Sequence, residues 1–412
     1  MSDDPSLADA PLALPRQHLP QGEDFLMWPP CLQSYGYRIV DQLFATRVVR
    51  RGDAVCELPR GREMAASYRH QGVERSIDEF MDRNNVAGLL AIQRGKVVTE
   101  RYGLGLQPHD RWSTMSMVKS MTAILAGAAV QDGALGIDDP VVRHLPQLKG
   151  SGYERVTVRQ LMTMSSGVDW SEDYGDRHSH VNRYSKSLAD KVPGGVLQLL
   201  QALLKAHEPG TAWHYNTGDT YLLGAVLCAA TGSTLADYLS EKIWQPCGME
   251  FDAYYTLESD NGQEIAGSRA GMALRDLGRF ALFVLANGAA QGRQVLPAGW
   301  IDTLASPAFA IPADFGPAMC KALGLTAYGF SWWLRQDGAM MAMGHAGQRL
   351  YIDRTEQLAV VQLAVYPEPR YASAHEPDQH DAPRPQRVAN PRQALVPVLC
   401  SMFGQSETHP FV

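Results

Sequence analysis

Ser116 and Lys119 stand three positions apart in the stretch 112–122 of the chain. If a helix begins in this stretch, side chains three positions apart lie on one face, about one turn from each other, and the amine reaches the hydroxyl. A serine hydroxyl is a weak nucleophile at neutral pH until a neighbouring base accepts its proton, and a partly desolvated lysine can be that base. The pair therefore indicates nucleophilic catalysis, although a serine and a lysine also reach this spacing by chance about once in a few hundred residues.

The stretches next to the pair predict elements that would hold it in place. Residues 123–130 are small and apolar on nearly every side, which predicts a helix buried in the centre of the fold. A serine in the first turn of that helix would lie where unpaired backbone N–H groups and the positive helix end stabilise a developing anion. Two β-rich runs within residues 86–102 meet at Arg94-Gly95 and predict an antiparallel hairpin before the serine.

The middle of the chain predicts helices and the end predicts strands. Tyr215 stands just before an apolar run at 222–230, which predicts a second buried helix. Strands before the serine and strands near the end of the chain imply a sheet whose two portions pair across a helical insert. Near the C-terminal end the residue pattern predicts strands at 328–334, 339–353 and 358–366. An exposed loop at 367–390 and a helix at 392–403 that covers the sheet are predicted to follow.

The composition is that of an ordinary globular protein rather than a nucleic-acid or membrane protein. The 412 residues are 45% apolar and 20% charged, which suffices for a sizeable core in one catalytic unit with two lobes. The net charge of -7, with no basic run beyond 47–51, argues against a polyanion-binding surface. The apolar stretches are far shorter than the run of about 20 residues that spans a bilayer. Residues 1–10 are acidic and lack the features of a secretory signal, so we expect a cytoplasmic protein.

Neither a metal site nor a cofactor site is expected. The six cysteines are scattered without CxxC spacing, so buried reduced thiols are expected rather than a disulfide framework or a zinc site. His178 and His180 are candidate ligands in a polar loop, but no third ligand accompanies them and no HExxH motif occurs. We therefore expect a protein without metal or cofactor.

Three stretches now stand in an informative order: Ser116 to Lys119, then Tyr215, then His345-Ala-Gly347. This order resembles the serine β-lactamase and penicillin-binding-protein superfamily, whose motifs are SxxK, a central Tyr or Ser, and a KTG-like triplet on a strand. The resemblance covers roughly residues 75–405 and includes residues 161–167, which are similar to the family's "LLTHTSG" segment.

The resemblance implies a fold class and a domain organisation. The fold is α+β, of the β-lactamase/transpeptidase type: an antiparallel sheet formed by the N- and C-terminal segments, flanked by helices, with a mostly helical inserted subdomain. Residues 1–75 would form an N-terminal extension that wraps the core, and residues 76–405 the serine hydrolase domain. The helical subdomain would span about 135–320.

Within the superfamily, the chain is most similar to the branch of 6-aminohexanoate-dimer hydrolases and related carboxylesterases. Residues 213–224 resemble that branch's aromatic-x-Tyr-x-Ser-x-x-Thr-x-x-Leu-Gly pattern, with Thr217 in place of the serine. The branch also carries a tryptophan and an Asp-Tyr pair after the Ser-Ser-Gly segment, which here would be Trp170 and Asp173-Tyr174. By that resemblance Tyr174 is a candidate to contact the leaving amine, with a solvent-facing loop tyrosine as the other interpretation.

Two departures from the penicillin-type motifs bear on the substrate. The lysine of KTG, which usually holds the carboxylate of a penicillin, is His345 here. Histidine has a reference pKa near 6.5, so it is mostly neutral at pH 7 and holds a carboxylate less well. The asparagine of the YxN motif is Thr217, and Asn216 stands one position early. Both changes favour an ester or linear-amide hydrolase over a β-lactamase.

The expected chemistry is acyl transfer in two steps. Lys119 and Tyr215 would accept the Ser116 proton, and Tyr215 would return a proton to the leaving group. By resemblance, the backbone N–H groups of Ser116 and Gln348 would form the oxyanion hole. His345 and Gly347 would border the substrate.

Alternatives to this function remain open from the sequence. They are a β-lactamase, a D-amino-acid peptidase, or a non-catalytic binding protein that keeps the fold. An α/β-hydrolase is disfavoured because no GxSxG motif occurs. The expected partner is a small ester or amide substrate, with a homodimer under consideration and neither nucleic acid nor membrane expected.

Overall fold

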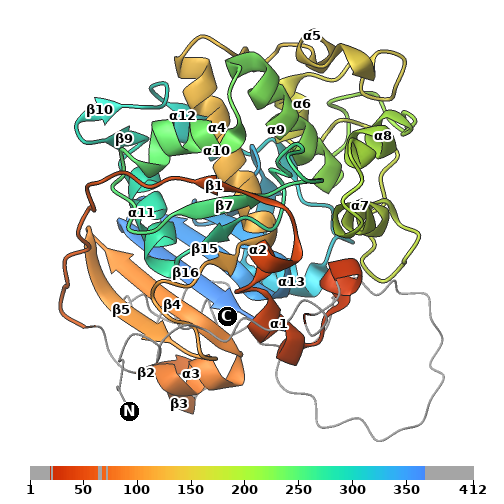
Figure 1. The fold of residues 1–412 in the computed structure, drawn as a ribbon. Helices are drawn as coiled ribbons and strands as arrows, with labels where there is room; N and C mark the ends of the chain where they lie inside the picture. Colours follow the sequence, from red (N-terminus) through yellow and green to blue (C-terminus); the bar gives the residue numbers. More distant parts are fainter. Residues whose placement is uncertain (1–18, 20–21, 64–66, 71–72, 367–412) are drawn as a thin grey trace, which may run out of the picture.

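The main sheet joins a hairpin from the N-terminal part of the chain to the last strands of the described residues. The structure is a computed structural model that describes residue 19 and residues 22–63, 67–70 and 73–366. Strand β16 pairs along its length with β4, so the C-terminal strands, blue in Figure 1, lie beside the orange hairpin β4–β5. The predicted α+β class, with a sheet built from N- and C-terminal segments, is confirmed. In spatial order the strands are β11 (Phe309–Ala310), β12 (Leu325–Tyr328), β13 (Trp333–Arg335), β14 (Met340–Gly344), β15 (Gln348–Asp353), β16 (Leu358–Ala364), β4 (Val86–Gln93) and β5 (Lys96–Tyr102).

The hairpin expected before the serine is present. Gln93 pairs with Lys96 across a two-residue turn, in which Arg94 has φ 49° and Gly95 has φ 74°. Positive φ at both turn residues matches the right-handed twist of the flanking strands, and glycine adopts this conformation without steric cost. The hairpin thereby sets the register of the edge that receives β16.

Of the three strands expected near the C-terminal end, the run at 358–366 corresponds to β16 (Leu358–Ala364), and the other two were too long. Run 328–334 is divided between β12 and β13, and the chain reverses between them with Ser331 at φ 62°. Run 339–353 is divided between β14 and β15, which are joined by the turn η7 (His345–Gly347). Both runs were interpreted as continuous strands, although glycines stand at each turn, at Gly329 in the first and at Gly344 and Gly347 in the second. The predicted buried helices and the hairpin before the serine occur near their expected positions. The loop at 367–390 and the helix at 392–403 lie outside the described residues.

The helix that carries Lys119 lies at the centre of the molecule. Helix α4 packs against α9 and β14, and nearly all its residues are buried, as predicted. Helix α11 packs across β4, β15 and β16 (Figure 1). The α-helices are α1 (Pro30–Gly36), α2 (Val40–Leu43), α3 (Ile77–Arg83), α4 (Val118–Gln131), α5 (Val141–His144), α6 (Val158–Met162), α7 (His180–Ala189), α8 (Gly195–Gln201), α9 (Thr217–Thr231), α10 (Leu235–Leu239), α11 (Leu274–Leu285), α12 (Trp300–Leu304) and α13 (Pro317–Leu323).

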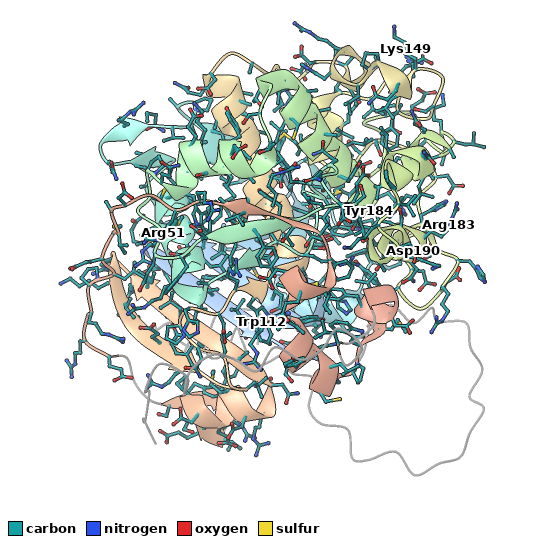
Figure 2. All side chains as sticks on the ribbon, viewed as in Figure 1. Arg51, Trp112, Lys149, Arg183, Tyr184 and Asp190 are labelled. Carbon is teal, nitrogen blue, oxygen red and sulfur yellow. The ribbon has the colours of Figure 1, made fainter. Side chains whose placement is uncertain are left out.

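A second, smaller sheet brings the N-terminal part of the chain to the core. Strand β1 (Thr46–Val49) pairs with β7 (Ala253–Thr256), followed by β8 (Gly271–Met272) and β6 (Trp112–Ser113). Trp112, labelled in Figure 2, is fully buried in this sheet. The remaining pairs are β2 (Ser67–His70) with β3 (Val73–Ser76) and β9 (Ala289–Ala290) with β10 (Arg293–Gln294). The proposed domain boundaries themselves stay a prediction.

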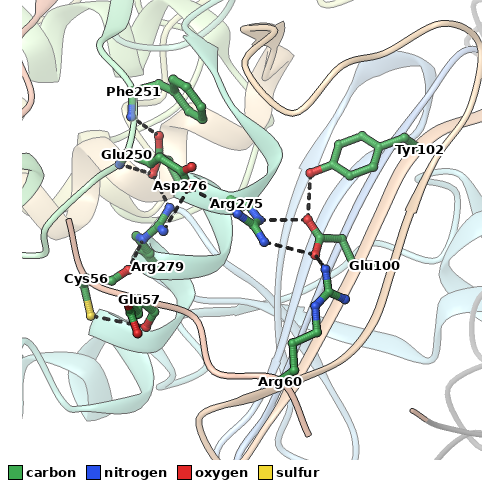
Figure 3. A network of polar contacts seen from close by, with 10 residues as sticks. All are labelled: Cys56, Glu57, Arg60, Glu100, Tyr102, Glu250, Phe251, Arg275, Asp276 and Arg279. Carbon is green, nitrogen blue, oxygen red and sulfur yellow. Dashed lines mark hydrogen bonds and ion pairs between the residues drawn. The ribbon is translucent and has the colours of Figure 1, made fainter. Parts of the chain in front are cut away.

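An ion pair and a hydrogen bond attach residues 56–60 to the main sheet and α11 (Figure 3). Glu100 on β5 accepts hydrogen bonds from Arg60 at 2.7 Å and from Arg275 at 2.8 Å. Arg279, one turn along α11, donates to Asp276 at 2.8 Å and to the carbonyl oxygen of Cys56 at 2.7 Å. Charge-assisted bonds of this kind are stronger than neutral ones, so they fix this segment across the core.

Two further expectations concern cysteines and membrane spans. Cys31 and Cys56 are exposed, so the expectation of buried thiols was wrong for these two. Among the described residues, no single helix is long and apolar enough to cross a bilayer. The segments Thr217–Thr231 and Leu235–Trp244 reach that length and composition only as a pair bent by 79°.

Candidate active site

The smaller sheet positions Ser116 next to the loop between β7 and β8. Ser113 on β6 pairs with Gly271 on β8, and the Thr114 N–H donates to the carbonyl oxygen of Ala270 at 2.8 Å. Ser116 follows within the 3-10 turn η4 (Met115–Met117), which leads directly into α4. The predicted helix start is therefore present, and it faces residues 267–270 of the β7–β8 loop.

Lys119 is buried against Ser116. Its side chain is 1% exposed, and its Nζ lies 2.9 Å from Ser116 Oγ. Nζ also donates to the carbonyl oxygen of Gly267 at 2.7 Å and to Thr217 Oγ1 at 3.1 Å. Burial lowers the pKa of Lys119 to about 8, while the negative charge of Glu172 acts in the opposite direction. A usable fraction of the amine is therefore neutral near physiological pH and can accept a proton.

Glu172 is the residue that the sequence interpretation missed. Its carboxylate accepts hydrogen bonds from Thr217 Oγ1 at 2.5 Å, from the Thr217 backbone N–H at 3.1 Å and from the Tyr174 hydroxyl at 2.8 Å. Trp170 Nε1 donates to the same carboxylate at 2.5 Å. Glu172 thus links three predicted site residues, Trp170, Tyr174 and Thr217, and Thr217 in turn contacts Lys119. The available signal was its place between Trp170 and Tyr174, but the resemblance pointed to Asp173 instead.

Asp173 and Asn216 stabilise the local backbone and are not among the described hydrogen-bond partners of Lys119. Asp173 Oδ1 accepts the backbone N–H of Gly175 at 2.8 Å, which stabilises a turn. The Asn216 side chain caps α9 by accepting the Asp219 N–H at 3.2 Å. Because Asn216 is the cap, Thr217 is the first helical residue and presents its hydroxyl to Lys119.

Tyr215 lies beside Lys119 in an aromatic cluster. The centroid of its ring is 5.3 Å from Lys119 Nζ. The ring stacks on Trp333 at 5.6 Å between centroids, and Phe315 and Tyr328 also contact it. These contacts bring Tyr215 to the lysine through its ring face, and the proton-transfer role of its hydroxyl stays a prediction.

Tyr174 and His345 meet at the pocket that opens beside Ser116. Their ring centroids are 5.3 Å apart, and both residues line the pocket together with Ser116, Thr217, Tyr184 and Arg269. Tyr174 is buried, which removes the interpretation of a solvent-facing tyrosine. The turn that carries His345 stands in place of the expected strand triplet.

Gly347 ends that turn, and the side chain of Gln348 supports it. The Gln348 side chain donates to the carbonyl oxygens of His345 at 2.9 Å and Ala364 at 2.8 Å. Its Oε1 accepts the indole N–H of Trp112 at 2.9 Å. Gly347 has φ 99°. These side-chain bonds give Gln348 a positioning role, and the oxyanion role of its backbone N–H stays a prediction.

Trp170 and His180 contact each other at the two ends of the loop 170–180. Their rings stack at 5.6 Å, and His180 Nδ1 accepts the backbone N–H of Ser171 at 2.9 Å. Among the described residues, no group of three or more His, Cys, Asp or Glu side chains is arranged to hold a metal ion. His178 is exposed.

A serine in contact with a buried lysine at the start of a core helix, beside an antiparallel sheet, is the arrangement of a β-lactamase-fold hydrolase. The family model described as Beta-lactamase matches residues 73–382, so the chain belongs to the β-lactamase family.

Known relatives agree with this classification. The chain is 27% identical over 341 residues to the 6-aminohexanoate-dimer hydrolase of Paenarthrobacter ureafaciens, which covers 81% of this chain and 85% of the relative. A solved structure from Bacillus anthracis, provisionally named as a 6-aminohexanoate-dimer hydrolase, superposes with a TM-score of 0.72 at 22% identity over 85% of this chain and 92% of that one. A penicillin-binding protein from Bacillus halodurans shares the fold at a TM-score of 0.55 and 20% identity, over 70% of this chain and 95% of that one.

Proposed function

We propose that this hydrolase cleaves an ester or linear amide bond through a covalent acyl-enzyme on Ser116. The observation that carries the proposal is the 2.9 Å contact between Ser116 Oγ and the buried Lys119 Nζ. Neutral Lys119 accepts the serine proton as Oγ attacks the carbonyl carbon, and water later releases the acyl group.

Glu172 and Thr217 hold the base in place. The Thr217 hydroxyl accepts from Lys119 and donates to Glu172, so the three groups form one hydrogen-bonded chain. The chain orients Nζ toward Ser116 and stabilises the ammonium that forms when the serine proton is transferred. Tyr215, whose ring lies beside Nζ, keeps its proposed role of returning a proton to the leaving group.

Linear amides and esters are the favoured substrates. The name of the Paenarthrobacter relative implies an amide between two 6-aminohexanoate units, and this chain covers 85% of that relative. His345 in place of the KTG lysine also argues against a penicillin as substrate. We therefore place 6-aminohexanoate oligomers and simple carboxylic esters ahead of β-lactams.

The test is a substrate panel with a matched serine control. Wild type, Ser116→Ala and Ser120→Ala are compared on p-nitrophenyl acetate and butyrate, on nitrocefin and on linear 6-aminohexanoate dimer. Ser120 lies one turn along α4 and donates to the carbonyl oxygen of Ser331, away from Lys119. We expect ester or amide turnover in wild type and Ser120→Ala and none above background in Ser116→Ala. Full activity of Ser116→Ala, or turnover of nitrocefin alone, would contradict the proposal.

A further inference from the structure

Arg269 is a buried cation with unused donors in the pocket beside Ser116. Its side chain is 1% exposed, and it lines the pocket that also contains Ser116 and Tyr174. One nitrogen, Nη2, donates a 2.6 Å hydrogen bond to Ser185 Oγ on α7. Its Nε and Nη1 have no hydrogen-bond partner among the described residues. The N–H groups of these two nitrogens are thus left for a ligand.

Among the described residues, no carboxylate balances the charge of Arg269. Burial lowers its pKa to about 10, and the groups acting in the opposite direction are the hydroxyls of Tyr184, Tyr37 and Tyr174. The guanidinium therefore stays cationic at neutral pH. Arginine is almost never fully buried without a partner, because the loss of hydration is costly. A buried, unpaired guanidinium at the edge of a pocket indicates a place for an anion.

Aromatic residues from the N-terminal part hold the guanidinium without using its N–H groups. Arg269 Cζ lies 4.5 Å from the ring centroid of Phe25 and 5.1 Å from that of Phe44. Such cation–π contacts act through the ring faces and leave the donors available. Phe25 and Phe44 lie outside residues 73–382, which match the family model. The two aromatic contacts of Arg269 therefore come from the N-terminal part of the chain, which the family model does not cover.

The backbone around Arg269 is also fixed. Arg269 has φ 59°, a left-handed conformation that residues other than glycine rarely adopt. Its carbonyl oxygen accepts a 2.7 Å hydrogen bond from Thr256 Oγ1. Gly267, two positions earlier, accepts from Lys119. The loop that positions the base therefore also positions the guanidinium.

We propose that Arg269 binds a carboxylate carried by the substrate, so that the pocket selects esters or amides with an anionic end. The proposal deepens the function proposed for Ser116 and rests on it. The planar guanidinium presents N–H donors in a geometry that suits a carboxylate. Apart from His345, Arg269 is the basic side chain among the described residues that line the pocket, and none of them is acidic.

Paired substrates test the preference. One pair places the carboxylate in the acyl part: mono-4-nitrophenyl glutarate against 4-nitrophenyl pentanoate. The other places it in the leaving group: 4-acetoxybenzoate against its methyl ester. In wild type we expect kcat/KM to favour the anionic member of at least one pair by about tenfold or more, as for one charge-assisted contact. Equal rates within both pairs would overturn the proposal without any variant.

Two variants locate the preference. In Arg269→Met the preference should disappear, while neutral esters are still cleaved. Arg183→Met removes the same charge from an exposed position on α7, next to Tyr184 in the sequence (Figure 2), and should keep the preference. Loss of the preference in both variants, or in neither, would overturn the assignment to Arg269.

A binding measurement separates this proposal from the catalytic one. Glutarate should raise the melting temperature of wild type and of Ser116→Ala by about 2 °C at saturating concentration, and neutral glutaramide should not. Because a melting temperature can be measured on the inactive Ser116→Ala variant, this result does not depend on whether an acyl-enzyme forms. Arg269→Met should show no glutarate shift, and its own melting temperature should equal or exceed that of wild type because an unpaired buried charge is gone. A lower melting temperature with an unchanged glutarate shift would show that Arg269 is only a structural residue.

Discussion

Lys119 and Thr217 stand 98 positions apart in the chain, yet Lys119 Nζ donates a 3.1 Å hydrogen bond to Thr217 Oγ1. The contact exists because α4 and α9 pack against each other in the core and the site lies where both helices begin. Thr217 passes the contact on to Glu172. The base is therefore held by two helices and a loop, rather than by the serine motif alone.

The pH dependence of the reaction should follow Lys119. Because the neutral amine is the base, kcat/KM should rise as the pH increases through about 8 and level off above it. Glu172 raises the pKa of Lys119, so Glu172→Gln should move the midpoint of this rise to lower pH. The measurement is the pH profile of p-nitrophenyl butyrate hydrolysis.

Asp173→Asn is the matched control for this profile. It removes the neighbouring negative charge, but among the described residues the Asp173 carboxylate accepts only the Gly175 N–H, so the midpoint should stay at its wild-type value. A shift to higher pH in Glu172→Gln would be incompatible with the proposed charge relationship.

The Thr217 hydroxyl should contribute through its two charged partners. Thr217→Val keeps the shape but removes the bonds to Lys119 and Glu172, and should lower kcat/KM about ten- to a hundredfold, as expected for hydrogen bonds to charged groups. Thr217→Ser keeps the hydroxyl and should stay close to wild type. Steady-state kinetics of both variants check this, and wild-type activity in Thr217→Val would contradict a role for the hydroxyl.

Gly347 should be required for stability of the turn beside His345. A Cβ at this position would lie 2.6 Å from the Tyr366 ring, and the φ of 99° disfavours any side chain. Gly347→Ala should lower the free energy of unfolding by about 2–4 kcal/mol, from backbone strain plus overpacking.

Gly338→Ala separates these two causes. Gly338 also has a positive φ, 85°, but a Cβ there would meet no atom within 4 Å. Its loss should be limited to strain, about 1 kcal/mol. Urea denaturation of both variants compares the values, and equal losses would mean that contact with Tyr366 is unimportant.

The sequence was most informative where the site is local. Ser116 and Lys119 belong to one helical turn, so their spacing alone predicts the contact that the structure contains. The hairpin at Arg94-Gly95 was predictable for the same reason, because its turn residues are adjacent.

Residues brought in by tertiary structure could not be found in this way. Glu172 reaches Thr217 from 45 positions away, and Arg269 meets Ser185 from 84 positions away. No periodicity or spacing relates such residues. The strand ends near His345 were missed because the run was interpreted as one continuous strand, although Gly344 and Gly347 flank the turn and Gly347 adopts a φ of 99°.

Covalent labelling of the nucleophile is the most direct test of the acyl-enzyme. Wild type is treated with a fluorophosphonate, and the modified peptide is identified by mass spectrometry, beside Ser116→Ala and Lys119→Met. We expect one adduct on Ser116, no adduct in Ser116→Ala, and labelling in Lys119→Met slowed by about a hundredfold or more, because the base is absent. An adduct on another residue, or a wild-type protein that remains unlabelled while folded, would contradict the assignment of Ser116 as the nucleophile.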